Sequence, residues 1–561
     1  MKKYLIIALI IVGCQPTIAQ EARVFTHADT LRGKLTPLRT CYDVTFYDLH
    51  LKIDIDHKSL TGYNVIHYKA VNDFSRLQLD LFSNLKIDSI MHLSNKLTYK
   101  RDGNAVFVDF AQKEMVGNND SIKVYYHGLP VTAAKPPWQG GFVWQKDANG
   151  KPWVGVACEE TGASLWWPCK DHLSDKPDSA RMTFDVPAGL MCVSNGRLRS
   201  QTDLKNGFNR FTWFVSVPIN NYDITVNIAD YAHIHDYYLN GKDTLTLDYY
   251  VLKYNEAAAR QYFQQVKLML ACYEKYFGKY PFYKDGYKLV ETNYWGMENQ
   301  SCIAYGNNYD DKKWGFDFII VHESAHEWWG NSVTCSDPAD MWLHEGFATY
   351  AEALYIECSQ DYSASLKYLK YQQFNIINKY PIIGPYNVNF QGTDNDNDMY
   401  YKGTWMLHTF RHVLNNDSLF FSILQSIQQQ FKYKTTNSSE VIAYINKLAG
   451  KDYTPFFDQY LKYPAIPVFD YTVKKKGNAT VLTYKWVTDV KNFIMPVKVT
   501  STYFIKKHVT PFPADSDIVK TYMTITPTQN WQTITINNLK SENFSVDTDE
   551  FYVKPKDEGK R

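Results

Sequence analysis

The chain has 561 residues, and its 60 Lys and Arg against 59 Asp and Glu give a formal net charge of +1 at pH 7. With 45% hydrophobic and 21% charged residues, the composition excludes a disordered chain, and the length suggests about three domains. A near-neutral chain without long basic runs lacks the charge expected of a nucleic-acid-binding protein. We therefore expect a globular protein with no nucleic-acid partner.

The segment 1–19 has the features of a signal peptide. Two lysines precede an apolar run over residues 4–13, and Ala19 ends a small-residue cleavage site. A lipoprotein signal is the alternative, with Cys14 acylated as the mature N-terminus. Both interpretations predict export, to the periplasm or as a secreted or lipid-anchored protein. The apolar run is too short to cross a bilayer, and no later stretch is long enough, so we expect no transmembrane span.

Changes in residue pattern divide the remaining chain into three domains. Residues 20–250 alternate apolar and polar positions, as strands do, and indicate a large β-domain. Residues 251–462 carry apolar positions at helical spacing in patches and indicate a mainly helical domain. Alternation returns over 463–561, which predicts a small β-sandwich. The predicted fold class is thus multidomain α+β.

The cysteines give no sign of a disulfide framework. Eight remain after the signal segment, far apart and without metal-like pairs, and a chain with large cores does not need covalent cross-links. We expect few or no disulfides among Cys41, Cys158, Cys169, Cys192, Cys272, Cys302, Cys335 and Cys358.

A metal-binding pattern stands in the middle of the helical domain. His322-Glu323-Ser324-Ala325-His326 matches H-E-x-x-H, inside an apolar stretch without Gly or Pro. On a helix, positions i and i+4 lie on one face, so both imidazoles reach one ion and Glu323 lies beside it. This is the arrangement of a zinc hydrolase.

A third ligand is expected nearby, because catalytic zinc usually has three protein ligands and one open position. Asp337-Pro338 is a helix start, and Glu345 lies in the segment that follows it. Two antiparallel helices with a short connection would return Glu345 to the histidine pair. We predict one zinc ion per chain, bound by His322, His326 and Glu345.

Four motifs together resemble the aminopeptidase N family of zinc exopeptidases, which also contains the leukotriene hydrolases. They are Trp295-Gly296-Met297-Glu298-Asn299, which is similar to G-x-M-E-N, the H-E-x-x-H segment with Trp329-Gly330-Asn331, the segment Leu343 to Ala348, and Tyr400-Tyr401-Lys402-Gly403, which is similar to Y-E-K-G. The resemblance implies a saddle-like N-terminal β-domain, a thermolysin-like zinc domain and aminopeptidase activity.

The resemblance also implies residue roles. Glu323 is expected to be the general base and Tyr400 to stabilise the oxyanion. Glu298 is expected to bind the free α-amine of a peptide, and Glu159 is its expected second ligand, with the adjacent Glu160 left open as the alternative. Three further residues complete the expected substrate-binding strand: Gly296, Met297 and Asn299.

A carboxylate is expected behind the zinc ligands, because metal-bound imidazoles are usually held by one. Glu352, two turns beyond Glu345, is the candidate. Asp394 to Asp398 begins like a calcium loop, but its sixth and twelfth positions are Met399 and Trp405, so we interpret it as acids at a helix N-terminus.

The sequence departs from the family at several points. Trp295 replaces the first glycine of G-x-M-E-N, which leaves the shape of the specificity pocket open. Glu327 replaces a glutamine after the second ligand, and the family's P-C-F-D-E-P is Pro168 to Leu173 here. Relatives often carry a large C-terminal helical domain that closes over the site. This sequence ends after its predicted β-sandwich, so we expect a more open cleft, closed by a partner subunit or by nothing.

These observations predict a zinc aminopeptidase whose partners are peptides with a free N-terminus. Two alternatives are an inactive peptide-binding surface protein of the same fold and an epoxide hydrolase of the leukotriene-hydrolase type. The preferred first residue and the oligomeric state stay open.

Overall fold

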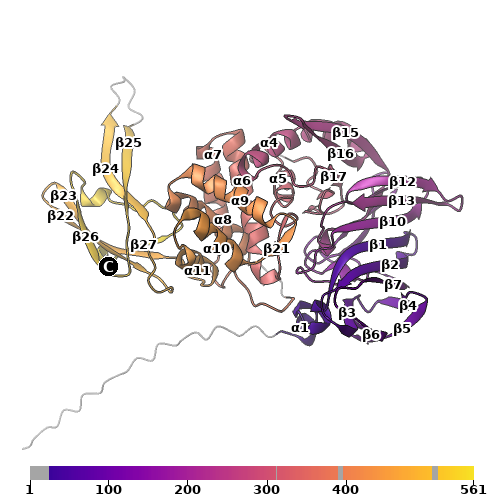
Figure 1. Ribbon diagram of the computed structural model, residues 1–561. Coiled ribbons are helices and arrows are strands. Elements are labelled where there is room, and N and C mark those ends of the chain that lie inside the picture. Colours follow the sequence, from indigo (N-terminus) through magenta and orange to yellow (C-terminus); the bar gives the residue numbers. More distant parts are fainter. Residues whose placement is uncertain (1–24, 311–312, 390–395, 508–515, 561) are drawn as a thin grey trace, which may run out of the picture.

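The computed structural model describes residues 25–310, 313–389, 396–507 and 516–560. The predicted signal segment and Cys14 lie outside the described residues. A β-rich N-terminal part and a smaller β-rich C-terminal part flank a helical part (Figure 1). The order β, α, β agrees with the fold class predicted from the residue patterns.

The largest sheet belongs to the N-terminal part. Its ten strands run in the order β12-β13-β10-β1-β2-β7-β4-β5-β6-β3. Their bounds are β1 Tyr42–Asp54, β2 Ser59–Ala70, β3 Phe74–Asp80, β4 Leu85–His92, β5 Asn95–Asp102, β6 Ala105–Glu114, β7 Asn119–Gly128, β10 Ser179–Pro187, β12 Arg197–Asp203 and β13 Phe208–Val215.

Strand β1 shows how the sequence alternation sets this sheet. Tyr42 and Val44 are buried, and from Tyr47 every second residue to Ile53 is buried again. The phase shifts by one residue where a β-bulge interrupts the pairing of β1 with β2, between Val44 and Phe46. A bulge adds one residue to a strand, so the apolar side chains on both sides of it can face the same core.

A second sheet leads into the site. It has the order β11-β14-β9-β8, with β8 Gly141–Lys146, β9 Pro152–Ala157, β11 Met191–Val193 and β14 Asn227–Ala229. The chain leaves β9 one residue before the Glu159-Glu160 pair.

A third sheet joins the N-terminal and helical parts. It has the order β15-β16-β17-β19-β18, with β15 Tyr231–Asn240, β16 Asp243–Leu252, β17 Tyr287–Glu291, β18 Gly296–Met297 and β19 Ile303–Tyr305. The boundary predicted at residue 250 falls within β16. Among the described strands, β15 and β18 are the two edges of this sheet.

Helices make up most of the central part. Their bounds, after α1 His27–Gly33 and α2 Pro37–Thr40 near the N-terminus, are α3 Glu256–Tyr262, α4 Gln265–Phe277, α5 Phe318–Ala325, α6 Trp342–Ser359, α7 Tyr362–Gln373, α8 Asp398–Leu414, α9 Asp417–Phe431, α10 Ser438–Ala449 and α11 Thr454–Leu461. Short 3-10 turns are η1 Ala163–Leu165, η2 Asn221–Asp223, η3 Lys253–Asn255, η4 Pro338–Asp340, η5 Ser541–Asn543 and η6 Glu558–Lys560. Strands β20 Val333–Cys335 and β21 Lys434–Thr436 pair in parallel. No helix of the described residues is long and apolar enough to cross a membrane.

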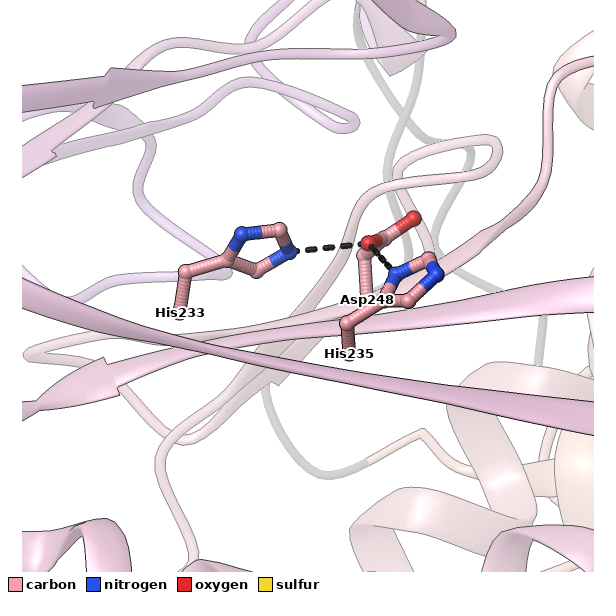
Figure 2. Close-up of side chains that lie close together, drawn as sticks. All are labelled: His233, His235 and Asp248. Carbon is pink, nitrogen blue, oxygen red and sulfur yellow. Dashed lines mark hydrogen bonds and ion pairs between the residues drawn. The ribbon is translucent and has the colours of Figure 1, made fainter.

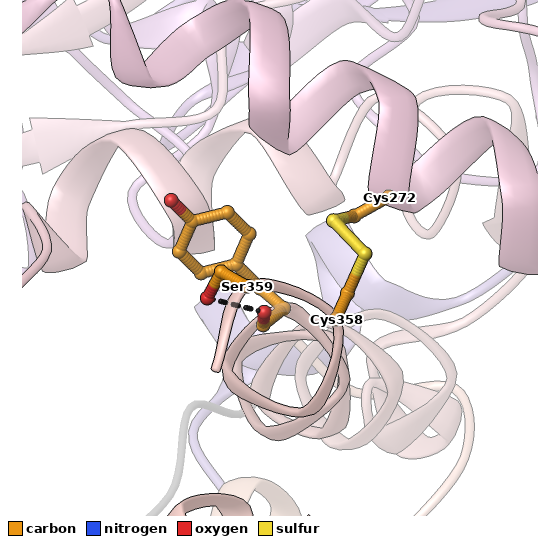
Figure 3. Close-up of a disulfide and its surroundings, with 4 residues drawn as sticks. Cys272, Cys358 and Ser359 are labelled. Atoms are coloured by element: carbon orange, nitrogen blue, oxygen red, sulfur yellow. Dashed lines mark hydrogen bonds between the residues drawn. A yellow bond between two sulfur atoms is a disulfide. The ribbon is translucent and has the colours of Figure 1, made fainter. Parts of the chain in front are cut away.

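One disulfide links two of these helices. Cys272 of α4 is bonded to Cys358 of α6 (Figure 3). The expectation of few or no disulfides allowed one but did not identify the pair. The other cysteines of the described residues are free and buried.

The C-terminal part consists of two sheets. A four-stranded sheet has the order β26-β23-β22-β27, and β24 and β25 form a hairpin. Their bounds are β22 Val468–Lys476, β23 Ala479–Val487, β24 Val497–Lys507, β25 Ser516–Ile525, β26 Gln532–Ile536 and β27 Lys554–Asp557. The segment before β27 contacts the helices: the Tyr552 carbonyl accepts from Tyr460 at 2.8 Å, and the Asp549 carbonyl accepts from His408 at 3.2 Å.

Candidate active site

Helix α5 carries the H-E-x-x-H pattern. Asp317 caps its N-terminus by accepting from the backbone of Ile319 at 3.1 Å, and Tyr305 fixes the Asp317 carboxylate with a bond of 2.6 Å. The regular helix ends at Ala325, and His326 is its C-cap in the α conformation. It is therefore shorter than the apolar stretch, which continues through turn residues up to Gly330 at φ +132°.

The third candidate ligand comes from the next helix. Asp337 caps the turn η4 by accepting from Ala339 at 2.9 Å, and Pro338 stands at its first position. Helix α6 begins at Trp342 and packs against α5, so Glu345 in its first turn faces the histidines. The helix start predicted at Asp337-Pro338 is thus present, with a 3-10 turn ahead of the α-helix.

His322, His326 and Glu345 converge at one buried point. Glu345 Oε2 lies 3.5 Å from Nε2 of His322 and 3.5 Å from Nε2 of His326, and the two Nε2 atoms are 3.3 Å apart. This oxygen is buried and has no hydrogen-bond partner within the described residues. Two imidazoles and one carboxylate are a common zinc donor set. The residues therefore fit the predicted zinc ion.

The other ring nitrogen of each histidine, Nδ1, forms a hydrogen bond on the side away from the predicted ion. His322 Nδ1 donates to Glu352 Oε1 at 2.6 Å, and His326 Nδ1 donates to the Trp329 carbonyl at 2.9 Å. Glu352 is itself fixed by Tyr368 and by Gln372, the latter at 2.8 Å. These bonds set both tautomers so that Nε2 is free for an ion. Glu352 thus has the position expected of a supporting carboxylate.

Charges in the cluster shift several pKa values. Burial would raise the pKa of Glu345, but His326 and His322 lower it well below the usual range. Burial and the Glu298 carboxylate raise the pKa of Glu323 and the two histidines lower it, with a net rise to about 8. A carboxyl group with a pKa near neutrality can both take and return a proton in one catalytic cycle.

The predicted substrate-binding strand, β18, runs beside Glu323. A Cβ atom on Gly296 would lie 2.5 Å from Glu323 Oε1, so glycine leaves room for the catalytic carboxylate. Met297 is buried and pairs with β19. The amide of Asn299 is buried and has no hydrogen-bond partner among the described residues.

Glu298 lies on the same side of the cluster. Its side chain accepts from the Tyr222 hydroxyl at 3.3 Å, and its carbonyl accepts from the Asn331 amide at 2.7 Å. Asn331 belongs to the Trp329-Gly330-Asn331 motif, which therefore ties the end of the zinc helix to the substrate strand. Carboxylate oxygens of Glu159, Glu298 and Glu345 lie within 4.8 Å of one another. The geometry thus favours Glu159 over Glu160 as the partner of Glu298.

A cavity opens beside these acids. Glu159, Glu160 and Tyr400 all lie in its wall, and the Tyr400 ring stacks at 6.3 Å over His322. Burial and the acids Glu345 and Glu159 raise the pKa of the Tyr400 hydroxyl, which keeps it protonated as a hydrogen-bond donor. The predicted oxyanion residue is therefore next to the metal centre.

The N-terminal segment contributes to the same cavity, which sequence reasoning missed. Arg32 and Gly33 of α1 line it, Arg32 pairs with Asp171 at 3.3 Å, and the Asp29 carbonyl accepts from Asn389 at 2.9 Å. The chain's own first helix thus reaches the loop before α8, and the expected closure by a partner subunit or by nothing stays a prediction. The local sequence of α1 does not indicate these contacts, because Asp171 and Asn389 are distant in the chain.

Trp295, the main departure from the family motif, does not fill the cavity. It is 45% exposed, stacks on Phe318 at 5.5 Å and lies 6.1 Å from Trp138, which is 41% exposed. Phe318 in turn stacks on His322 at 5.4 Å. The indole therefore extends an aromatic surface outward from the metal centre.

The other departures have structural partners. Glu327 accepts from the backbone of Ser301 at 2.7 Å and from Tyr280 at 3.2 Å, which holds the loop after the substrate strand. In the segment Pro168 to Leu173, the Lys170 ammonium donates to the Tyr42 carbonyl at 2.7 Å. These substitutions are built into the fold and leave the ligand set intact.

The acidic segment before α8 is described only from Asp396 onward. Asp398 begins the helix and accepts from the backbone of Ile377 and Asn378, at 2.8 Å each. It thus fixes the start of the helix that carries Tyr400, in agreement with acids at a helix N-terminus. Asp394 lies outside the described residues.

The N-terminal β-rich part and the helical part both match known protein families. Residues 262–460 match the Peptidase family M1 domain, and residues 44–222 match the Peptidase M1 N-terminal domain. Aminopeptidase B of Mus musculus is 24% identical over 71% of this chain and 66% of its own length. Endoplasmic reticulum aminopeptidase 1 of Mus musculus is 24% identical over 54% of this chain and 34% of its own length.

The chain thus spans between a third and two thirds of these two relatives. A crystal structure of a mutant M1 zinc metallopeptidase from Deinococcus radiodurans, bound to a Tyr-Ser-Ala substrate, has a TM-score of 0.64 and 22% identity. The match covers 76% of this chain and 95% of the other. With both M1 domains matched in order around the predicted metal centre, the chain belongs to peptidase family M1.

Proposed function

We propose that the protein is a zinc-dependent aminopeptidase that removes the first residue of peptides. One observation carries this proposal: the general base Glu323 and the ligand set lie directly beside the carboxylates of Glu298 and Glu159. Two acids there can hold a charged α-amine and leave no room for a chain that continues beyond it. The named aminopeptidase relatives support the same conclusion.

The chain's own residues have separate tasks in this reaction. Zinc, when bound by His322, His326 and Glu345, acidifies water and polarises a carbonyl group. Glu323 accepts the proton of the attacking water and passes it to the leaving amine. The Tyr400 hydroxyl donates a hydrogen bond to the oxygen on which negative charge develops.

The position of the amine anchor gives the substrate a direction. Strand β18 is an edge strand, so an extended peptide can pair with it. With the α-amine at Glu298 and the scissile bond beside Glu323 and Gly296, the next residues of the peptide extend toward Trp295. We infer that Trp295 and Trp138 contact the residues that follow the cleaved bond.

We also propose that the protein is exported. The signal-like segment 1–19 supports this, with Cys14 as a possible lipid attachment site under the alternative processing. The disulfide between Cys272 and Cys358 is a second argument, since structural disulfides persist in oxidising compartments.

Matched peptides with a free and an acetylated N-terminus test the activity. We expect cleavage of the free-amine peptide only, lost on chelation and restored by zinc. Glu298→Gln and Glu159→Gln should each raise KM about 10-fold or more, because each removes a charge-assisted bond to the amine. Glu160→Gln is the matched control and should change KM much less.

Cleavage of the acetylated peptide would replace the proposal with endopeptidase activity. Zinc and peptide binding without any cleavage would favour the inactive peptide-binding alternative.

A further inference from the structure

A second group of metal-ligand side chains lies on the opposite edge of the sheet that contains β18. His233 and His235 belong to β15, the outer strand, and Asp248 belongs to β16, directly opposite His235. Residues two apart on a strand face the same side, and a directly opposed residue on the paired strand shares that side. The three side chains therefore stand together by strand geometry.

Both imidazoles point at one oxygen atom. His233 Nε2 donates to Asp248 Oδ1 at 2.8 Å, and His235 Nδ1 donates to the same atom at 2.7 Å (Figure 2). One ligand atom from each residue lies within 4.8 Å of the other two. Two imidazoles and one carboxylate are ligands that zinc, copper and nickel prefer, and three ligands leave positions open for water.

Neighbouring groups hold these side chains in place. Tyr250 stacks on His233 with ring centroids 4.4 Å apart, and Tyr237 packs edge-on against His235 at 4.7 Å. Arg197 lies 3.8 Å from the other carboxylate oxygen, Asp248 Oδ2, and leaves Oδ1 to the histidines. His233, His235 and Asp248 are therefore held in place by their neighbours before any ion binds.

The site is accessible and separate from the catalytic centre. The side chains of His233 and His235 are 46% and 43% exposed, so an ion reaches them from solvent. Four strand spacings separate β15 from β18, which is about 19 Å at the usual distance between strands. An ion here would not contact the residues assigned to peptide hydrolysis.

We propose that His233, His235 and Asp248 bind one divalent transition-metal ion of the zinc, copper and nickel class at the edge of this sheet. On binding, each imidazole changes tautomer: the proton on the nitrogen that now bonds to Asp248 leaves to solvent, and the other ring nitrogen takes one up, so each ring stays neutral and binds the ion through the freed nitrogen. Bound there, the ion cross-links β15 to β16.

Zinc titration of the full mature chain tests this proposal, with a protein that carries no histidine tag. We expect two zinc ions per chain by calorimetry and elemental analysis, one of them lost in His235→Ala and in Asp248→Asn. Both variants should keep the other zinc ion and the wild-type peptidase rate. His50→Ala is the matched control, because His50 also donates to an aspartate, Asp48 at 2.8 Å, but the described residues form no group of three potential ligands there.

A copper titration gives a second measurement that does not depend on activity. The electron paramagnetic resonance spectrum of Cu²⁺ added to the chain that holds one equivalent of zinc, at the catalytic centre, should show coupling to two nitrogen atoms, absent in His235→Ala. Binding of a single zinc ion by the wild type, or a second ion that persists in both variants, would overturn the proposal. Neither result would affect the assignment of the catalytic centre.

Discussion

Tyr400 is the residue whose predicted role depends most on its surroundings. Its phenol lies in the cavity wall and stacks over His322. Tyr400→Phe should lower kcat about 100- to 1000-fold with little change in KM, because the hydroxyl acts on charge that develops only in the transition state. Tyr401→Phe, one position along α8, is the control for steady-state kinetics. An unchanged kcat in Tyr400→Phe would remove the oxyanion role.

Trp295 gives a second prediction at this scale. Trp295→Ala should lower kcat/KM about 10-fold for peptides with a large apolar second residue and leave an aminoacyl amide unaffected, since the amide has no residue to contact the indole. Trp531→Ala, which also removes a half-exposed indole, is the control. Equal losses of kcat/KM for the peptide and the amide would show that Trp295 does not act by contacting the second residue.

The residues that bind metal could be predicted from sequence because their spacing is local. His322 and His326 are one helical turn apart, and Glu345 follows within a short connection. Tyr222 and Arg32 could not be predicted, since their contacts with Glu298 and the cavity join residues far apart in the chain. Such contacts depend on how the sheets and helices pack, which no local pattern encodes.

At the scale of elements, the disulfide is the clearest case of this limit. Cys272 and Cys358 are 86 residues apart, and only the packing of α4 beside α6 brings them together. The helical spacing in the sequence indicated both helices but not their pairing. The same holds for the edge position of β18, which follows from the order of the strands.

The disulfide should stabilise the helix that carries Glu345. Replacing both cysteines by serine should lower the free energy of unfolding by about 3 kcal/mol, because the cross-link restricts the unfolded chain. Urea unfolding with and without a reducing agent measures this effect. The reducing agent should shift the wild-type midpoint and leave the double variant unchanged, and a wild type that does not respond would contradict the cross-link.

At the scale of the whole molecule, an ionic contact joins the C-terminal β-part to the helices. Glu550 pairs with His412 of α8 at 3.2 Å and with Lys498 of β24. Burial alone would raise the pKa of Glu550, but these partners lower it to about 2. The folded state therefore favours the charged carboxylate, so this contribution is complete above about pH 4.5 and is lost as the pH falls toward 2.

Glu550→Gln should then cost about 1 kcal/mol of stability at pH 7. The difference from wild type should persist down to about pH 5 and narrow below it. Urea midpoints across this range provide the measurement, with Glu542→Gln, a change at an exposed acid, as the control. A difference that does not change down to pH 3 would assign the effect to packing rather than charge.

The order of the three parts was predictable, because apolar spacing changes from alternating to helical and back. The sheet that joins the first two parts was not, since β15 and β16 share one sheet with strands from beyond residue 250. Likewise, the contact of the first helix with the loop before α8 joins Asp29 and Asn389, which are far apart in the chain.

The most direct test of the central claim is to return zinc in fractional steps to the chelator-stripped chain. At each step, mass spectrometry follows the products from an unblocked tripeptide. The account predicts that the rate rises with zinc and levels off once one ion has bound at His322, His326 and Glu345, whether or not a second ion binds at His233, and that only the first residue is released. Glu323→Gln should bind the same ion and be slower by about 1000-fold. A rate that does not depend on zinc, or a Glu323→Gln chain that keeps its activity, would contradict the account.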